Sequence, residues 1–263
     1  MRKCATALPA WRAFLVVLSL ALSCHIPFAA ALESDSEAVA LLRLTEQQLR
    51  PGTSTSAYQV LIVRPEWQRV LRFRSCDDRG NDRFRLEVID PVKIRGTVFL
   101  KVGGALSMYL PKLKRTIAIS PVMMQDEWMG SDFNNQDLVD AGALIDHYAH
   151  RVVARERQGD AEVITIESTA RGDSPVVWDR LVQRVRSEGV PVEVEYRDAR
   201  GTTLRRLSFH DVREMGGRRI PTRWVMEPLE RPGQRTEIML EEVEFGVPIP
   251  DALFEMPTGV KPP

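Results

Sequence analysis

This sequence has little of what covalent or metal chemistry requires. Of its three cysteines, Cys4 and Cys24 lie near the N-terminus, so Cys76 is alone in the remainder and has no partner for an intramolecular disulfide. It contains no phosphate-binding loop, dinucleotide-binding glycine pattern, Gly-x-Ser-x-Gly elbow or His-Glu-x-x-His zinc motif. The sequence therefore predicts a protein without a cofactor, a metal or catalytic residues.

Long apolar runs are missing from most of the chain. Beyond the N-terminal region, no segment approaches the ~20 apolar residues that a membrane-spanning helix needs. The one apolar run, at 13–22, follows a basic stretch and precedes small residues that end at Ala31, which is the pattern of a secretory signal peptide. We therefore interpret residues 1–31 as a signal peptide cleaved near Ala31, and residues 32–263 as one exported domain of a bacterial envelope.

Cys24 leaves a second route of processing open. A cysteine just after an apolar run is a candidate site of lipid attachment. The preceding Ala21-Leu22-Ser23 is a poor version of the Leu-Ala-Gly type of sequence that normally stands before such a cysteine. Cleavage near Ala31 would release a free protein, whereas processing at Cys24 would tether it to a membrane.

An excess of charge of either sign is also missing. The chain has 36 basic and 36 acidic residues, and removing Arg2, Lys3 and Arg12 with the signal peptide leaves 33 basic against 36 acidic. Nucleic-acid binding needs clustered positive charge, so we expect none. The arginine clusters alternate with apolar residues and are interpreted as solvated strand faces; they include Arg205, Arg206, Arg218 and Arg219.

What is present is a repeated strand pattern behind one helix. Ser34 and Glu37 have capping-box spacing and begin an amphipathic helix that ends before Pro51-Gly52. Short alternating segments separated by tight turns follow, and they predict roughly ten to twelve strands in an antiparallel meander. The segments are 58–64, 67–76, 83–90, 93–102, 161–169, 181–187, 191–197, 203–212, 220–226 and 235–245.

The alternation stops at residues 121–133, where methionines and large aromatic residues crowd together. Asn134 or Asn135 is then placed to cap a helix whose apolar stripe is Leu138, Ala141, Ile145 and Tyr148. This insertion would cover one face of the sheet as a lid. Either the sheet closes into a barrel, or a curved half-barrel holds an apolar cavity beneath the lid.

Two groups of titratable residues have the composition of a site but not its spacing. His147 and His150 lie three positions apart beside Asp146, yet no third metal ligand has motif spacing, so a surface pair is the favoured interpretation. The carboxylates that flank the insertion could in principle serve as acid and base, but no nucleophile or cofactor motif lies nearby, so solvation and helix capping are the favoured interpretation; they are Asp126, Glu127 and Asp132.

Several motifs together resemble the LolA-like outer-membrane lipoprotein-sorting proteins of the periplasm. They are Asp90-Pro91, the Arg-Gly-Thr-Val-Phe-Leu run at 95–100, Tyr109-Leu110-Pro111 with Lys114-Arg115, and Met124 followed by Trp128-Met129-Gly130-Ser131-Asp132-Phe133. The resemblance extends loosely from the first helix to Phe254. It implies a mainly β fold with a few helices: an incomplete antiparallel β-barrel with a helical lid over an apolar cavity.

The resemblance also implies a function and its parts. Members of this family carry lipoprotein acyl chains or lipid toward the outer membrane as chaperones, which implies an inner-membrane transporter and an outer-membrane acceptor as partners of a monomeric carrier. An arginine ties sheet to lid in such carriers, and by region Arg69, Arg72 and Arg95 are its candidates. The alternative is a non-catalytic accessory module of an inner-membrane transporter or envelope assembly.

Cavity or lid residues are expected where large apolar side chains share a strand face or belong to the insertion. A register error of one residue would turn any of the strand residues outward. The candidates are Trp67, Leu71, Phe73, Phe84, Leu86, Phe99, Tyr109, Met123, Met124, Trp128, Met129 and Phe133.

Overall fold

The computed structural model describes residues 35–140, 144–172, 174 and 176–257, which fall into one compact unit. The proposed signal peptide and the alternative lipid site at Cys24 lie outside the described residues. The strands are β1 (Thr53–Arg64), β2 (Trp67–Asp78), β3 (Arg83–Asp90), β4 (Val98–Val102), β5 (Ala105–Leu110), β6 (Arg115–Ala118), β7 (Tyr148–Gln158), β8 (Ala161–Ala170), β9 (Arg180–Arg186), β10 (Pro191–Arg197), β11 (Thr203–Met215), β12 (Arg218–Pro228) and β13 (Arg235–Phe245).

The helices are few and short. The α-helices are α1 (Ser36–Leu49), α2 (Asn135–Asp140) and α3 (Leu144–His147). The 3₁₀ turns are η1 (Arg79–Asn81), η2 (Val92–Ile94), η3 (Pro121–Gln125), η4 (Trp128–Gly130) and η5 (Asp251–Phe254). Among the described residues, no helix is both long and apolar enough to span a bilayer.

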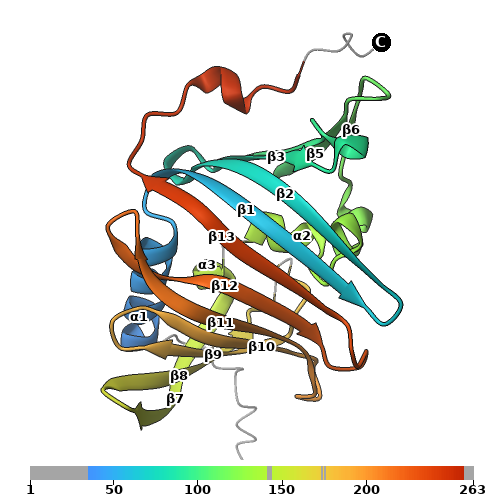
Figure 1. The fold of residues 1–263 in the computed structure, drawn as a ribbon. Coiled ribbons are helices and arrows are strands. Elements are labelled where there is room, and N and C mark those ends of the chain that lie inside the picture. Colours follow the sequence, from blue (N-terminus) through green and yellow to red (C-terminus); the bar gives the residue numbers. More distant parts are fainter. Residues whose placement is uncertain (1–34, 141–143, 173, 175, 258–263) are drawn as a thin grey trace, which may run out of the picture. The chain divides into compact units, whose positions relative to one another are not determined.

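All thirteen strands join one antiparallel sheet that does not close (Figure 1). Its order runs from β6 back to β1, passes to β13, and continues down to β7. Chain neighbours are therefore sheet neighbours everywhere except at β6 and β7, which are the two free edges. The insertion between them, residues 119–147, must cross from one edge to the other. This settles the choice between a closed barrel and an open half-barrel in favour of the open sheet.

The strand predictions are confirmed in most places and wrong in four. The bounds of β3, β10 and β13 match the sequence segments, and the sheet has one strand more than the upper limit predicted. β5, β6 and β7 are not among the predicted segments, and the expected strand at 93–102 is shortened, because η2 occupies its first residues and β4 begins only at Val98. The helix expected to run through Tyr148 ends earlier, since Tyr148 begins β7; Ala141 lies outside the described residues.

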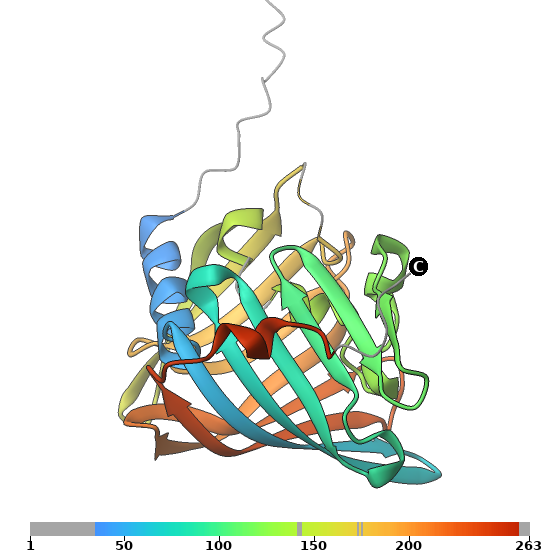
Figure 2. The ribbon, with the colours of Figure 1, turned by 90° about the horizontal axis from the view of Figure 1, so that it is seen from above.

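Strand pairing places one set of side chains on a common inner face. Leu86 lies opposite Phe99 across β3 and β4, and Leu207 lies opposite Met226 across β11 and β12. Because facing residues in an antiparallel pair point to the same side, these contacts extend a single apolar surface across the sheet. The sheet curves around this surface, and the insertion lies inside the curve (Figure 2).

The helix α1 covers the part of the inner face that β8 and β9 form. Asp35 caps it, accepting a hydrogen bond from the backbone N–H of Glu37 at 2.9 Å, in place of the predicted Ser34, which lies outside the described residues. Its buried residues, Ala38, Leu41 and Leu42, pack against the inner residues of β8 and β9. The stripe recurs at helical spacing, so burial of this face rather than intrinsic propensity holds the helix in place.

Candidate functional site

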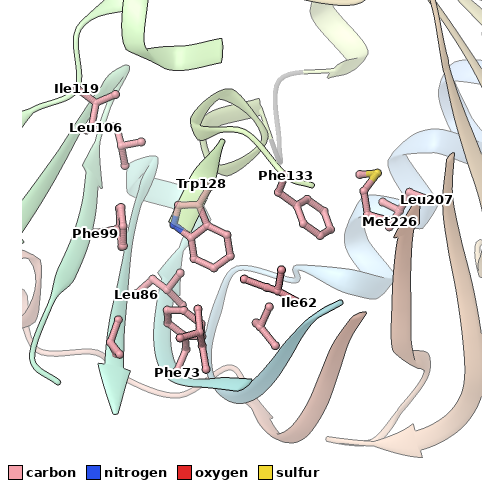
Figure 3. Close-up of a cluster of buried hydrophobic side chains, with 13 residues drawn as sticks. Ile62, Phe73, Leu86, Phe99, Leu106, Ile119, Trp128, Phe133, Leu207 and Met226 are labelled. Carbon is pink, nitrogen blue, oxygen red and sulfur yellow. The ribbon is translucent and has the colours of Figure 1, made fainter. Parts of the chain in front are cut away.

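The inner face and the insertion share one apolar cluster, which we call the inner cluster (Figure 3). Trp128 lies at its centre, 3% exposed, with its ring centroid 5.2 Å from that of Phe73 and 5.9 Å from that of Phe99. Phe133, 8% exposed, reaches toward Met226 and Leu207 on the other side. The insertion therefore fills the hollow of the sheet with its own side chains.

Most of the predicted cavity and lid residues meet in this inner cluster. Those buried in it or packed against it are Leu71, Phe73, Phe84, Leu86, Phe99, Met123, Met124, Trp128, Met129 and Phe133. Trp67 has the right strand parity but stands at the end of β2, 47% exposed, where Arg64 and Arg69 lie over its ring. Trp67 therefore contacts the two guanidinium groups and is not part of the inner cluster.

Tyr109 lies on the outer face of the sheet. It packs with Val98, Leu100 and Phe254 in a second cluster that the C-terminal segment covers. Its neighbour Met108 is the residue of β5 that pairs with Phe99 and faces inward. The placement of Tyr109 in the cavity is thus a register error of one residue.

The turn that joins Trp128 to Phe133 is closed upon itself. The backbone N–H of Trp128 donates to the carbonyl of Phe133 at 2.8 Å, and Met129 and Gly130 adopt left-handed φ values of 56° and 73°. The Ser131 hydroxyl, fully buried, donates to the carbonyl of Trp128 at 2.6 Å. The two aromatic side chains are therefore carried into the inner cluster by one compact loop.

Arg64 and Thr236 fasten this loop to the sheet through Asp132. Arg64 Nη1 is 3.0 Å from Asp132 Oδ2, and the Thr236 hydroxyl donates to the same oxygen at 2.6 Å. Arg64 Nη2 also donates to the carbonyl of Gly130 at 2.8 Å. These partners surround a carboxylate whose side chain is only 2% exposed, so losing one of them would leave a buried polar group without a partner. Asp132, weighed from the sequence as an acid or base, is an anchor.

A second arginine, Arg205, fastens α2. Its guanidinium donates to both carboxylate oxygens of Asp137, at 2.8 and 2.5 Å, and it stacks between Trp178 and Tyr196 with ring centroids 4.4 and 4.1 Å away. Burial, the largest single effect, would lower the pKa of Arg205, but the charges of Asp137, Tyr196 and Asp132 and the hydrogen bond to Asp137 together raise it. Arg205 is 6% exposed, so the prediction of a solvated arginine was wrong here.

Of the three arginines that the family resemblance nominated, one contacts the insertion. Arg69 donates to the carbonyl of Met129, and burial followed by repulsion from Arg64 lowers its pKa. Arg72 instead contacts Gln59 on the neighbouring strand, and Arg95 donates to the carbonyl of Ile89. Sequence reasoning missed Arg64 and Arg205, although Arg205 shares the strand parity of the inward residues Leu207 and Phe209.

The carboxylates and histidines outside these anchors have other roles. Glu127 forms an exposed ion pair with Arg231 at 2.8 Å. His150, expected at the surface, is 1% exposed; its Nδ1 is 2.8 Å from the Ser168 hydroxyl and its Nε2 is 3.0 Å from the carbonyl of Ile145. Burial lowers its pKa. Within the described residues, no group of three metal-ligating side chains comes together.

Comparison with solved structures identifies the class of fold. A LolA superfamily protein from Nitrosomonas europaea matches with a TM-score of 0.70 at 19% identity, over 83% of this chain and 97% of that one. A domain assigned to outer membrane lipoprotein sorting from Vibrio parahaemolyticus gives 0.73 at 20% identity, over 83% and 96%. A DUF1329 family protein from Desulfovibrio piger gives 0.73 at 21% identity, over 84% and 98%.

The fold is therefore LolA-like, as the sequence motifs implied. A family model described as "Uncharacterized protein" matches residues 80–258, more than half of the chain. The chain belongs to that family. No curated protein matches its sequence.

Proposed function

We propose that this protein is a periplasmic carrier that binds lipoprotein acyl chains or lipid and moves them toward the outer membrane. One observation carries the proposal: the apolar inner face of an open sheet is covered by a separate insertion rich in methionine and aromatic residues. The likeness of the fold to a LolA superfamily protein and to a lipoprotein-sorting domain supports it.

Cargo would take the place that the insertion now fills. Each methylene moved from water into apolar surroundings contributes about 0.8 kcal/mol, so an acyl chain can replace the contacts that Trp128 and Phe133 give up. Met123, Met124 and Met129 border this space, and their flexible thioethers can adapt to chains of different shape.

The arginine anchors would set the cost of opening. When the insertion leaves the sheet, Arg64 and Asp132 become hydrated together, which offsets much of their lost attraction. The apolar surface left behind has no such compensation until a chain covers it. Opening is therefore coupled to loading, and release needs a competing apolar acceptor. An inner-membrane transporter and an outer-membrane acceptor are the partners this cycle requires.

A second candidate function follows from the same packing. Because the insertion fills the inner face with its own side chains, the protein could act without cargo, as a non-catalytic accessory module of an inner-membrane transporter or envelope assembly. In that case the sheet edges or the insertion would be the contact surface.

Native mass spectrometry after detergent-free purification from a periplasmic extract separates the two. The carrier predicts bound lipid, and Phe99→Ala should lower its occupancy, whereas Val98→Ala should not. These neighbours are 2% and 1% exposed but face opposite sides of β4, so the pair controls for lost stability. A lipid-free mass together with a stably associated membrane protein would favour the accessory module.

A further inference from the structure

Two apolar side chains stand in solvent on adjoining loops at one end of the sheet. Val92 in η2 is 70% exposed, and Leu113 in the turn between β5 and β6 is 63% exposed. In an antiparallel meander, the β3–β4 and β5–β6 connections lie at the same end. The loops also lie close together, since a Cβ placed on Gly96 would be 3.7 Å from Pro111 Cγ.

Basic side chains surround these two apolar tips. The segments 90–95 and 111–115 contain one acidic residue, Asp90, and five exposed basic residues: Lys93, Arg95, Lys112, Lys114 and Arg115. Arg95 Nη2 lies 3.9 Å from Asp90 Oδ1. The other four form no ion pair with any residue that the structure describes. This surface, which we call the basic rim, therefore carries positive charge that the molecule does not neutralise locally.

The backbone of the basic rim is held in place. In the turn, the N–H groups of Leu113 and Lys114 donate to the carbonyls of Leu110 and Pro111, each at 3.2 Å. In the η2 loop, the N–H of Gly96 donates to the carbonyl of Val88 at 2.9 Å. Both tips are thus presented in a fixed arrangement, so little ordering entropy opposes their contact with a partner.

We propose that the basic rim docks on a bilayer surface that carries anionic phospholipid headgroups. Lysine and arginine side chains around protruding apolar residues are the combination that holds proteins at such an interface, because headgroup attraction adds to the burial of the apolar tips. Val92 adjoins Lys93, and Leu113 lies between Lys112 and Lys114, so each apolar tip stands beside positive charge, whereas a protein partner is favoured by a continuous apolar patch. The inner cluster has no part in this contact.

Co-sedimentation of the mature protein, residues 32–263, with vesicles tests the proposal. We expect binding to vesicles of phosphatidylglycerol mixed with phosphatidylcholine, little binding to phosphatidylcholine alone, and release as salt rises. Lys93→Glu with Lys112→Glu should lower the partition coefficient at least tenfold. Val92→Ser with Leu113→Ser should lower it several-fold and leave the salt dependence in place.

Matched controls make the result specific. Arg213→Glu with Arg219→Glu reverses two exposed arginines near the opposite end of the sheet, and Val153→Ser removes an apolar side chain of the edge strand β7 that is 46% exposed; both variants should bind vesicles like the wild type. Trp128→Ala should also bind normally, which separates this proposal from the carrier function. Equal vesicle binding by the rim variants and the wild type would overturn the membrane assignment. So would rim variants that bind vesicles normally but no longer bind an acidic protein.

Discussion

The two ends of the inner face are covered in different ways. Over β8 and β9, α1 packs aliphatic side chains against Ile164 and Ile166, beside hydrogen bonds that join His150, Ser168 and Gln183. Over the rest of the face, the insertion packs aromatic and thioether side chains and is fastened by buried arginine ion pairs. The first cover is part of an ordinary core. The second has contacts that lipid and water can replace, so we infer that only the insertion opens.

Removal of an anchor should have the largest effect. Arg205→Ala leaves the Asp137 carboxylate, 17% exposed, without its bidentate partner, and should lower the free energy of unfolding by about 3–5 kcal/mol. Arg231→Ala, which breaks an exposed pair with Glu127, should cost no more than about 1 kcal/mol. Urea denaturation measures both. Equal losses would mean that burial gives the Arg205 anchor no special role.

Truncation under each cover should separate stability from binding. Ile166→Ala beneath α1 should cost about 2–5 kcal/mol and leave uptake of a fluorescent fatty acid unchanged in the folded fraction. Trp128→Ala should weaken that uptake strongly. Fluorescence titration beside thermal unfolding gives both quantities. Parallel losses of uptake in the two variants would show that the covers do not differ in function.

Acid should weaken the end covered by α1. Burial lowers the pKa of His150, against a rise from the hydrogen bond to Ile145. Its folded pKa then lies below the unfolded value of about 6.5, so the unfolded chain binds more protons just below that pH. The stability that neutral His150 contributes is therefore present above pH ~6.5 and is lost as the pH falls below it.

Comparison of the wild type with His150→Gln isolates the contribution of His150 to the pH dependence of stability, because all other titratable groups are the same in both proteins. Urea midpoints measured between about pH 7.5 and pH 5 should fall further in the wild type. Parallel pH profiles would mean that His150 titrates in the folded protein as it does in the unfolded chain.

The smallest effect concerns the turn of the insertion. Gly130→Ala and Gly103→Ala both place a Cβ on a left-handed backbone, which costs about 1–2 kcal/mol. Only at Gly130 does the new Cβ approach a neighbour, 3.2 Å from Arg69 Nη2. Gly130→Ala should therefore cost slightly more in thermal denaturation. A loss equal to that of Gly103→Ala would show that Arg69 moves aside freely, and a smaller loss would show that the new contact is favourable.

The sequence predicts the antiparallel β architecture well, because alternation and turn residues are local signals, whereas alternation leaves open whether the sheet closes. The bounds of β3, β10 and β13 follow from them. β5 and β6 are short hairpin strands whose pattern is interrupted by Pro111 and the basic turn, so they escape detection. Tyr148 reads as part of a helical stripe, yet pairing with Ala170 makes it the first residue of β7. Such long-range pairing leaves no mark in a local window.

The candidate site is predictable in its apolar part and less so in its anchors. Phe73, Phe99 and Trp128 follow from pattern, whereas Tyr109 fails by one register position. Arg205 sits at an inward parity with Leu207, which marks it in hindsight, but its partner Asp137 comes from a distant segment. A charged residue is assigned to the solvent from sequence alone, because the partner that would allow its burial lies in a distant segment.

Hydrogen exchange tests the central claim most directly: the insertion opens while α1 stays closed. Amides of residues 121–139 should exchange through local opening at a lower free energy than those of α1 and β8. Addition of a fatty acid should speed exchange in 121–139 and leave α1 unchanged. Exchange of 121–139 only through global unfolding, with no response to the fatty acid, would contradict the account.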